Sequence, residues 1–229
     1  MTIPLRGISS MATRHILDEL VAAYGQLSGR AVTVESVGGV EAQRRVQAGE
    51  AFDWVALAAD ATQRLVASGR VLAGSRVDLA LSPVALAVRA GAVRPDVGSE
   101  QALRHAVLSA RSVGYSTGPS GTHLQRLFER WGIAAQIQPR LVQAPPGVAV
   151  GALVARGEVE LGFQQLSELM HLEGIDVVGT LPAAVEFITT FAAGVCAGSA
   201  HTDAARKLLL YLASPASAAA KRRHGMQPA

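Results

Sequence analysis

Residues 45–60 read RVQAGEAFDWVALAAD, and this stretch contains a helix end, a strand and a helix start in direct succession. Gly49 is placed to end a helix predicted for Val40–Ala48, because glycine readily takes the left-handed conformation of a C-cap. Trp54–Ala58 is an unbroken apolar run, typical of a strand covered on both faces. Asp60 is then predicted to cap a short helix. The stretch therefore predicts an alternation of helices and strands.

The same alternation extends along the chain in both directions. Apolar strands are predicted at Leu5–Ile8, Ala31–Glu35, Val113–Ser116, Ile137–Val142 and Glu160–Phe163. Helices are predicted between them, at residues 12–27, 99–110, 121–131 and 147–155. This rhythm predicts an α/β fold of open, mostly parallel sheets flanked by helices.

Two longer extended stretches interrupt the rhythm, at residues 76–90 and 186–195. The first is too long for one strand, and Pro83 is predicted to break it. We expect these stretches to be two hinge crossings, near Ser82-Pro83 and near residues 189–192. Lobe one is then residues 1–82 plus 190–229, including two C-terminal helices, and lobe two is residues 83–189.

Composition narrows the class of protein. The chain has 229 residues, of which 49% are hydrophobic, enough for one large core or two modest ones. No apolar run reaches the roughly 18–20 residues of a membrane span. The net charge is +3, but the basic residues are scattered. The one tight cluster, residues 221–224, is predicted to be a solvated helix end, so nucleic-acid binding is not expected.

The N-terminal residues and the cysteine content leave the compartment open. Residues 1–6 contain no apolar segment of the kind that a secretory signal needs. We expect a periplasmic protein if a signal peptide was removed from the sequence, and a cytoplasmic one if the sequence is full length. Cys196, the single cysteine, follows an apolar run and is predicted to be a buried, inert thiol.

Short turns of small residues stand where a strand ends and a helix begins. They include Gly7–Ser10, Ser36–Gly39 and Ser116–Thr122. The first turn of a helix has unpaired backbone N–H groups with partial positive charge, and small residues let a ligand approach them closely. We expect Ser9 and Ser10 to contact a ligand, with helix capping as the alternative. Gly38-Gly39 fits a binding turn and a simple tight turn equally, and Ser99 is assigned only a capping role.

Several segments together resemble the bacterial solute-binding proteins of the molybdate-binding type. They are Ile8–Met11, residues 45–60, Gly118–Thr122 and Leu153–Phe163, and the resemblance covers nearly the whole chain. It implies a type II periplasmic-binding-protein-like fold, in which two α/β lobes close on an anion. The segments also resemble the branch of this family that includes aconitate isomerase.

The resemblance implies a set of ligand-binding positions in this sequence. They are Ser9, Ser10, Gly38, Gly39, Ala58, Ala59, Ser120, Gly121, Thr122, Gly147, Gln164 and Gln165. Two positions depart from the family: no hydroxyl follows Ser36 in its loop, and Gln164-Gln165 replace an expected tyrosine. An amide both donates and accepts hydrogen bonds, whereas a tetrahedral oxyanion needs only donors. The departures therefore favour a ligand with carboxylates and a neutral polar group.

Three functions are open to such a chain. The first is a solute-binding receptor for a small anion, working with an ABC permease. The second is a cofactor-free isomerase of an unsaturated polycarboxylate, with His123 as its proton-transfer group and Glu168 and Asp60 as further candidates. The third, an effector domain of a transcription regulator, fits poorly because lobe one begins near residue 3. We favour the receptor. No metal or cofactor is expected, because the sequence has no paired metal-ligand spacing and no dinucleotide or phosphate loop.

Overall fold

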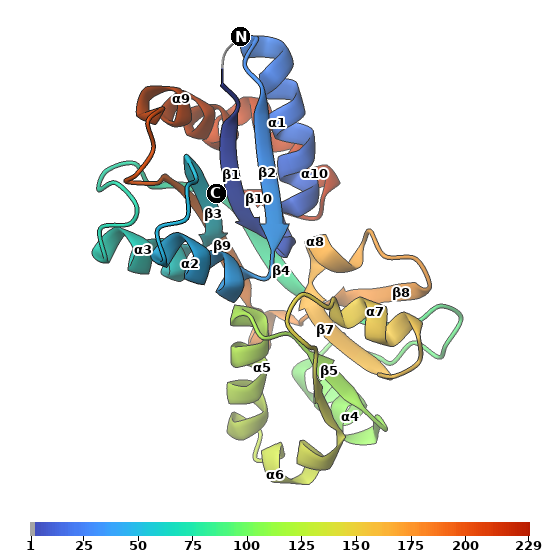
Figure 1. Cartoon of the computed structure of the whole chain (residues 1–229). Helices are drawn as coiled ribbons and strands as arrows, with labels where there is room; N and C mark the ends of the chain where they lie inside the picture. Colours follow the sequence, from blue (N-terminus) through green and yellow to red (C-terminus); the bar gives the residue numbers. More distant parts are fainter. Residues whose placement is uncertain (1–2) are drawn as a thin grey trace. The chain divides into compact units, whose positions relative to one another are not determined.

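The computed structural model describes residues 3–229, and its internal contacts divide the chain into two compact units (Figure 1). Unit 1 is the chain up to Ser82 together with Thr190–Ala229, and unit 2 is Pro83–Thr189. Both passages between the units lie inside strands, β4 (Val77–Arg89) and β9 (Ile188–Val195).

Unit 1 has a sheet in the order β2-β1-β3-β9-β4, with β10 paired to β4. Its elements are β1 (Leu5–Ser10), the 3-10 turn η1 (Met11–Thr13), α1 (Arg14–Ser28), β2 (Val32–Val37), α2 (Gly39–Gln47), β3 (Trp54–Ala58), α3 (Ala59–Ala67), α9 (Thr202–Ala213), η4 (Pro215–Ser217), α10 (Ala218–Arg223) and β10 (Gln227–Pro228). β1 runs parallel to β2 and β3, so the carboxyl ends of these three strands share one edge of the sheet.

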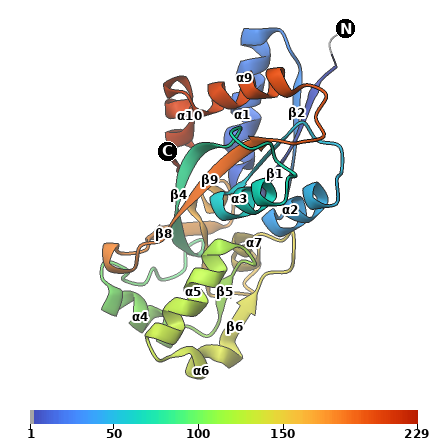
Figure 2. The same ribbon diagram turned by 90° about the vertical axis from the view of Figure 1, so that its left-hand side faces the viewer.

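Helices cover both faces of this sheet (Figure 2). The apolar residues of α1 and α9 pack with Trp54 and Ala56 on one face, and those of α2 and α3 pack with Val55 and Leu57 on the other. The buried pattern of β3 confirms the prediction that Trp54–Ala58 is a strand covered on both sides.

Unit 2 has the strand order β4-β7-β5-β6, with β8 paired to β4. Its elements are α4 (Glu100–Ser109), β5 (Val113–Tyr115), α5 (Pro119–Arg130), α6 (Ala134–Ile137), η2 (Gln138–Arg140), β6 (Leu141–Gln143), α7 (Val150–Ala155), β7 (Leu161–Gln165), α8 (Leu166–Leu169), β8 (Ile175–Thr180) and η3 (Ala183–Val185). β5 is parallel to β6 and β7, with Tyr115 opposite Phe163. Ser99 caps α4 as predicted, its Oγ accepting a hydrogen bond from the Ala102 N–H at 3.1 Å.

The predicted break at Pro83 is wrong, because β4 is one strand of 13 residues. Proline cannot donate a backbone hydrogen bond, and Pro83 is outside the ladders with β10 and β7. Ala80 and Leu81 pair with β10, and the pairing with β7 begins only at Val84. Pro83 stands between these two ladders.

Unit 2 contains further errors of element type. Ile137–Val142 was expected as a strand, but Ile137 ends α6 and only Leu141–Gln143 is extended. Ile133 and Ile137 lie four positions apart, which is helical spacing, and both enter the core. The β8 strand was not predicted at all. Gly147 does not begin a helix, because its φ is 80° and α7 starts at Val150.

Two expectations about single residues in unit 1 also need correction. Asp60 does not cap α3, whose N-cap is Ala58, and lies exposed in the first turn. The basic cluster near the C-terminus is not fully solvated, since Lys221 is only 1% exposed and burial lowers its pKa to about 8. In the same cluster, the Nε2 atom of His224 lies 2.9 Å from Glu19 Oε2.

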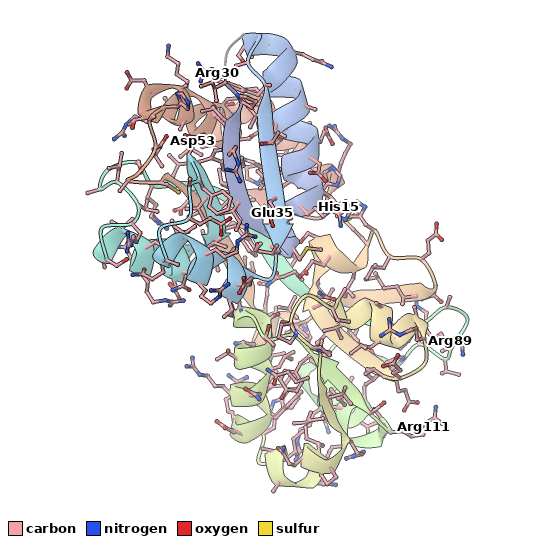
Figure 3. All side chains as sticks on the ribbon, in the orientation of Figure 1. His15, Arg30, Glu35, Asp53, Arg89 and Arg111 are labelled. Carbon is pink, nitrogen blue, oxygen red and sulfur yellow. The ribbon has the colours of Figure 1, made fainter. Side chains whose placement is uncertain are left out.

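Asp53, labelled in Figure 3, connects three segments of unit 1. Its Oδ2 accepts a hydrogen bond from the Arg6 N–H at 2.9 Å, and its Oδ1 accepts one from the Ser199 hydroxyl at 2.6 Å. Its backbone carbonyl accepts from the N–H of Cys196. The Cys196 thiol is buried, and burial raises its pKa to about 12, which agrees with the inert thiol expected from the sequence.

The packing of Trp54 on Gly7 gives a first prediction. A Cβ at Gly7 would lie 2.1 Å from Cε2 of the buried indole, so Gly7→Ala forces a shift in the core. We expect a loss of about 2–4 kcal/mol in the free energy of unfolding, measured by urea denaturation. Gly25→Ala is the control: its nearest neighbour would be 3.4 Å away and its position is inside α1, so it should be neutral or stabilising by up to about 1 kcal/mol. Equal losses in both variants would contradict the packing argument.

Candidate functional site

The carboxyl edge of the unit 1 sheet places two serines against two helix starts. Ser9 is fully buried, and its Oγ lies 2.8 Å from the Ser36 Oγ on β2. Ser10 is 7% exposed, and its Oγ is buried with no hydrogen-bond partner among the described residues. A Cβ at Gly39 would lie 3.5 Å from the Cβ of Ser10, so the first turn of α2 adjoins this serine. A buried hydroxyl without a partner is costly unless a ligand or water satisfies it.

The helices at this edge begin without side-chain caps. The N-cap of α2 is Gly38 and that of α3 is Ala58, and neither can provide a capping oxygen from its side chain. The first backbone N–H groups of each helix therefore lack an intrahelical partner and carry partial positive charge. Ala58 and Ala59 are half-buried. Ser10, Gly39 and the two uncapped helix starts together form the unit 1 half-site, a set of hydrogen-bond donors.

Unit 2 has a corresponding turn between β5 and α5. Ser120 is 2% exposed, and its Oγ lies 2.9 Å from the Ser116 Oγ. A Cβ at Gly121 would lie 1.8 Å from the Ser116 carbonyl oxygen, so only glycine fits this position. Thr122 is exposed and its N–H bonds to the Gly118 carbonyl. Ser120 and Gly121 are thus the buried part of this turn.

Gly147, Gln164 and Gln165, the remaining positions implied by the resemblance, differ in exposure and in their hydrogen bonds. Gly147 is exposed in the loop before α7. Both polar atoms of Gln164 are engaged, because Oε1 accepts from the Gly151 N–H at 3.2 Å and Nε2 donates to Glu168 Oε1 at 2.9 Å. Gln165 is different: Nε2 donates to Thr189 Oγ1 at 2.7 Å, whereas the buried Oε1 has no partner among the described residues. Gln165 retains an acceptor for a ligand.

His123 is partly buried near the start of α5. Its ring stacks on Phe187, with centroids 4.2 Å apart and planes inclined by 11°. Burial lowers the pKa of His123 below its usual 6.5, although a hydrogen bond with the Val185 backbone opposes this shift. The imidazole is therefore neutral at pH 7 and packed against an aromatic side chain.

Glu168 has the unusual titration in this part of the chain. Burial raises the pKa of its carboxyl from 4.5 to about 7, and the hydrogen bond from Gln164 opposes the shift only in part. The sequence points to Glu168 as a candidate but does not predict its raised pKa. It does carry a hint, because Glu168 is the one charged residue in residues 161–170, which include the buried strand β7.

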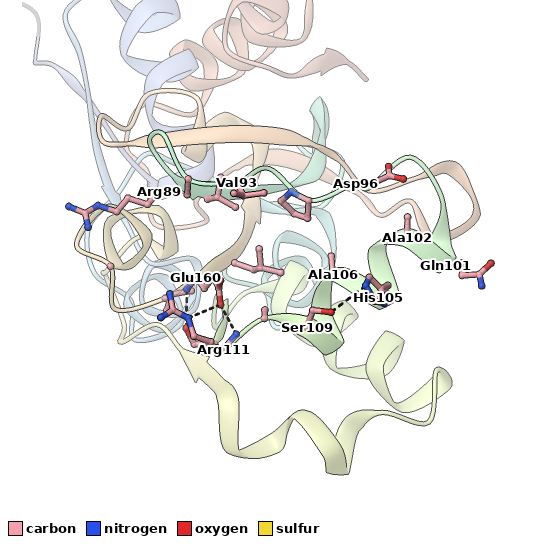
Figure 4. A pocket seen from close by; sticks show the side chains of 18 of the residues that line it. Arg89, Val93, Asp96, Gln101, Ala102, His105, Ala106, Ser109, Arg111 and Glu160 are labelled. Atoms are coloured by element: carbon pink, nitrogen blue, oxygen red, sulfur yellow. Dashed lines mark hydrogen bonds and ion pairs between the residues drawn. The ribbon is translucent and has the colours of Figure 1, made fainter.

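A separate open pocket of about 1100 Å³ lies elsewhere in unit 2 (Figure 4). Its lining includes Arg89, His105, Arg111 and Glu160. Glu160 Oε2 accepts a hydrogen bond from the Arg111 backbone N–H at 2.6 Å and a longer one from Arg111 Nε at 3.4 Å. Arg111 and Glu160 precede β5 and β7, so the pocket is at the opposite end of these strands from Ser120 and Gln165. None of the predicted ligand-binding residues lines it.

Two kinds of feature are absent from residues 3–229. No helix there is long and apolar enough to cross a membrane. Within the same residues, no group of three or more His, Cys, Asp or Glu side chains is arranged to hold a metal ion.

Residues 5–227 match the family described as bacterial extracellular solute-binding protein. The chain belongs to this family. It is 43% identical over 187 residues to an aconitate isomerase from Pseudomonas sp, covering 80% of this chain and 70% of that protein. Its structure is similar to the periplasmic molybdate-binding protein of Azotobacter vinelandii, with a TM-score of 0.80, 20% identity and 97% and 98% of the two chains covered. A sulfate-binding protein of Mycobacterium tuberculosis gives a TM-score of 0.79 at 17% identity, covering 99% of this chain and 87% of that one.

These similarities confirm the fold class and the family expected from the sequence. The chain has the α/β fold of the periplasmic binding proteins. At 20% identity or less, the solved structures give the fold and not the ligand.

The raised pKa of Glu168 gives a second prediction. Between about pH 4.5 and 7, the unfolded chain loses this proton while the folded chain keeps it, so the contribution of Glu168 to stability falls as pH rises and levels off above about 7. Glu168→Gln removes this effect. Relative to the wild type, the stability of the variant should rise by about 3 kcal/mol between pH 4.5 and 7.5, measured by denaturation across that range. Glu173→Gln, an exposed control, should change by less than about 0.5 kcal/mol. A constant difference for Glu168→Gln would contradict the shifted pKa.

Proposed function

We propose that this chain is a solute-binding protein for a small polycarboxylate. The observation that carries the proposal is the Oγ of Ser10, which is buried without a partner among the described residues. It adjoins the uncapped start of α2, and α3 begins, also uncapped, at the end of the neighbouring parallel strand β3. Hydroxyl and backbone N–H donors at helix starts stabilise an anion without a formal positive charge on the protein. Within unit 2, the Ser120-Gly121 turn begins α5, whose N-cap Gly118 likewise has no side-chain cap.

Two features favour carboxylates over a tetrahedral oxyanion. The loop Val37-Gly38-Gly39 supplies no hydroxyl, so unit 1 offers fewer donors than a family member with serines there. Gln165 has a buried Oε1 without a partner, which needs a donor from the ligand. A fully ionised oxyanion has only acceptors, whereas a polycarboxylate can present a protonated carboxyl or a hydroxyl.

In the receptor role, the ligand is passed to an ABC permease. Membership of the family described as bacterial extracellular solute-binding protein supports this partner. The protein's own part is to select the anion, and the permease is the component that crosses the membrane.

A second candidate is isomerisation of an unsaturated tricarboxylate. It is favoured by the 43% identity to an aconitate isomerase, and by the carboxyl of Glu168, which is half ionised near neutral pH. The fold itself does not decide between a receptor and an enzyme. Both candidates use the same class of ligand, so binding and turnover are tested in turn.

The third prediction concerns binding. In a melting-temperature screen, cis-aconitate, trans-aconitate and tricarballylate should stabilise the chain more than molybdate, tungstate or sulfate, because a ligand that binds only the folded state raises its melting point. Ser10→Ala and Ser120→Ala should each weaken carboxylate binding by about 1–2 kcal/mol, measured by calorimetry. Ser99→Ala is the control, because it removes a helix cap and should lower stability without changing the dissociation constant. Tight molybdate binding without carboxylate binding would overturn the proposal.

The fourth prediction separates the two candidates. Purified chain is incubated with cis- or trans-aconitate, without added metal or nucleotide, and the isomers are separated by chromatography. The receptor alone leaves both isomers unchanged, and the enzyme brings either one to the same equilibrium mixture. The rate should scale with protein concentration and should be lost on heat denaturation, which excludes spontaneous isomerisation.

A further inference from the structure

The carboxyl of Glu168 is connected to two neighbouring elements of unit 2 through one side chain. Gln164 donates from Nε2 to Glu168 Oε1 at 2.9 Å and accepts at Oε1 from the N–H of Gly151 in α7. The amide is therefore fixed at both ends, and it holds the carboxyl in one orientation. Among the described residues, no second hydrogen-bond partner is found for Glu168, so the other carboxyl oxygen is available.

Glu168 lies at the same edge of the sheet as the Ser120 turn. β5 and β7 are parallel with Tyr115 opposite Phe163, so the Ser116–Ser120 turn follows β5 at the edge where Gln164, Gln165 and α8 follow β7. Ligands of open α/β sheets bind outside the carboxyl ends of the strands. A carboxyl at this edge is in the region where a ligand would lie.

Among the described residues, no positive charge is found to act on the Glu168 carboxyl. α8 packs on β7, which has no charged residue, and on β8, whose one charged residue is Asp176. Leu169 of α8 also packs on Ala85 and Ala87 of β4, whose charged residues, Asp78 and Arg89, are near the two ends of that strand. The Asp176 carboxylate accepts a hydrogen bond from the Gly91 N–H. His171 and Glu173 follow α8 and are exposed. The carboxyl can therefore gain and lose a proton near neutral pH, as an acid–base group must.

We propose that Glu168 is the acid–base group of the ligand site and exchanges a proton with the bound polycarboxylate, with Gln164 as its positioning residue. The inference rests on the proposed function and names the residue of that site that binds and releases a proton. In the receptor role, Glu168 in its acid form donates its O–H to a ligand carboxylate. The ionised form repels the same carboxylate, so binding takes up a proton.

In the isomerase role, the same carboxyl moves a proton along the ligand. Ionised Glu168 removes a proton from the saturated carbon next to the double bond, so that one C–H bond breaks and one O–H bond forms. The electron pair shifts the double bond, and charge develops on the adjoining carboxylate, where N–H and hydroxyl donors stabilise it. Glu168 then returns the proton to the far carbon of the allylic unit. Nothing is oxidised or reduced, and the enzyme ends in its starting state.

The two other titratable candidates are less well placed for this role. The ring of His123 stacks on Phe187, and Asp60 is exposed in the first turn of α3. Glu168 differs from both because Gln164 orients its carboxyl and one of its oxygens remains available.

The inference is tested with Glu168→Gln, which keeps the shape and can still accept the bond from Gln164, and with Glu173→Gln as the matched control. Tricarballylate, which has no double bond, is titrated by calorimetry at pH 7.5 in buffers of different ionisation enthalpy. Wild type and control should take up about half a proton or more per ligand, and Glu168→Gln should take up none. Wild-type affinity should fall up to tenfold per pH unit above pH 7, and that of Glu168→Gln should stay constant.

Turnover gives the second measurement. If wild type interconverts the aconitate isomers, Glu168→Gln should lower kcat at least about 100-fold while binding tricarballylate no more weakly than wild type at pH 8. Equal proton uptake by wild type and Glu168→Gln overturns the inference but leaves the proposed function intact. The absence of any melting-temperature shift with polycarboxylates overturns the proposed function, and the inference falls with it.

Discussion

Unit 1 depends on the carboxylate of Asp53, which lies just before β3. It accepts one hydrogen bond from the start of β1 and another from Ser199, beyond the end of β9. With these strands fixed at one end, β1 and β3 pair in a single register, with Ser9 opposite Ala56. The strands therefore end side by side, and the turns that follow them begin at the same edge. The Asp53 carboxylate, at the start of β1 and β3, therefore helps to align the hydrogen-bond donors of the unit 1 half-site, which lie at the carboxyl ends of the same strands.

Much of the architecture follows from local sequence because each strand is short, apolar and bounded by turn residues. The run Trp54–Ala58 is an example, since it buries four of its five successive apolar residues and leaves only Ala58 half-buried. The failures occur where tertiary pairing overrides local rules. Pro83 lies inside β4 between its pairing with β10 and its pairing with β7, a position that local sequence does not reveal. β8 is half-exposed throughout, so its residues lack the clear alternation that identifies a strand.

The candidate site also has features that the local sequence predicts and features that it does not. Turns such as Ser116–Thr122 are recognisable in the sequence because small residues, proline and the following apolar period mark a helix start. The different states of Gln164 and Gln165 are not recognisable, although the two residues are identical and adjacent. Successive side chains of a strand point to opposite faces, so one amide meets α7 and Glu168 and the other meets Thr189. Burial and partners of this kind depend on segments far away in the sequence.

The position of Cys196 has a practical consequence for spectroscopy. Its sulfur is buried and its pKa is far above neutral, so thiol-reactive dyes, which require an accessible thiolate, leave the native chain unlabelled. A cysteine introduced at an exposed position such as Val93 then becomes the single reactive thiol without any background substitution. The wild-type sequence can therefore carry a fluorophore or spin label at one chosen point, and ligand binding can be followed as a change in that probe's signal.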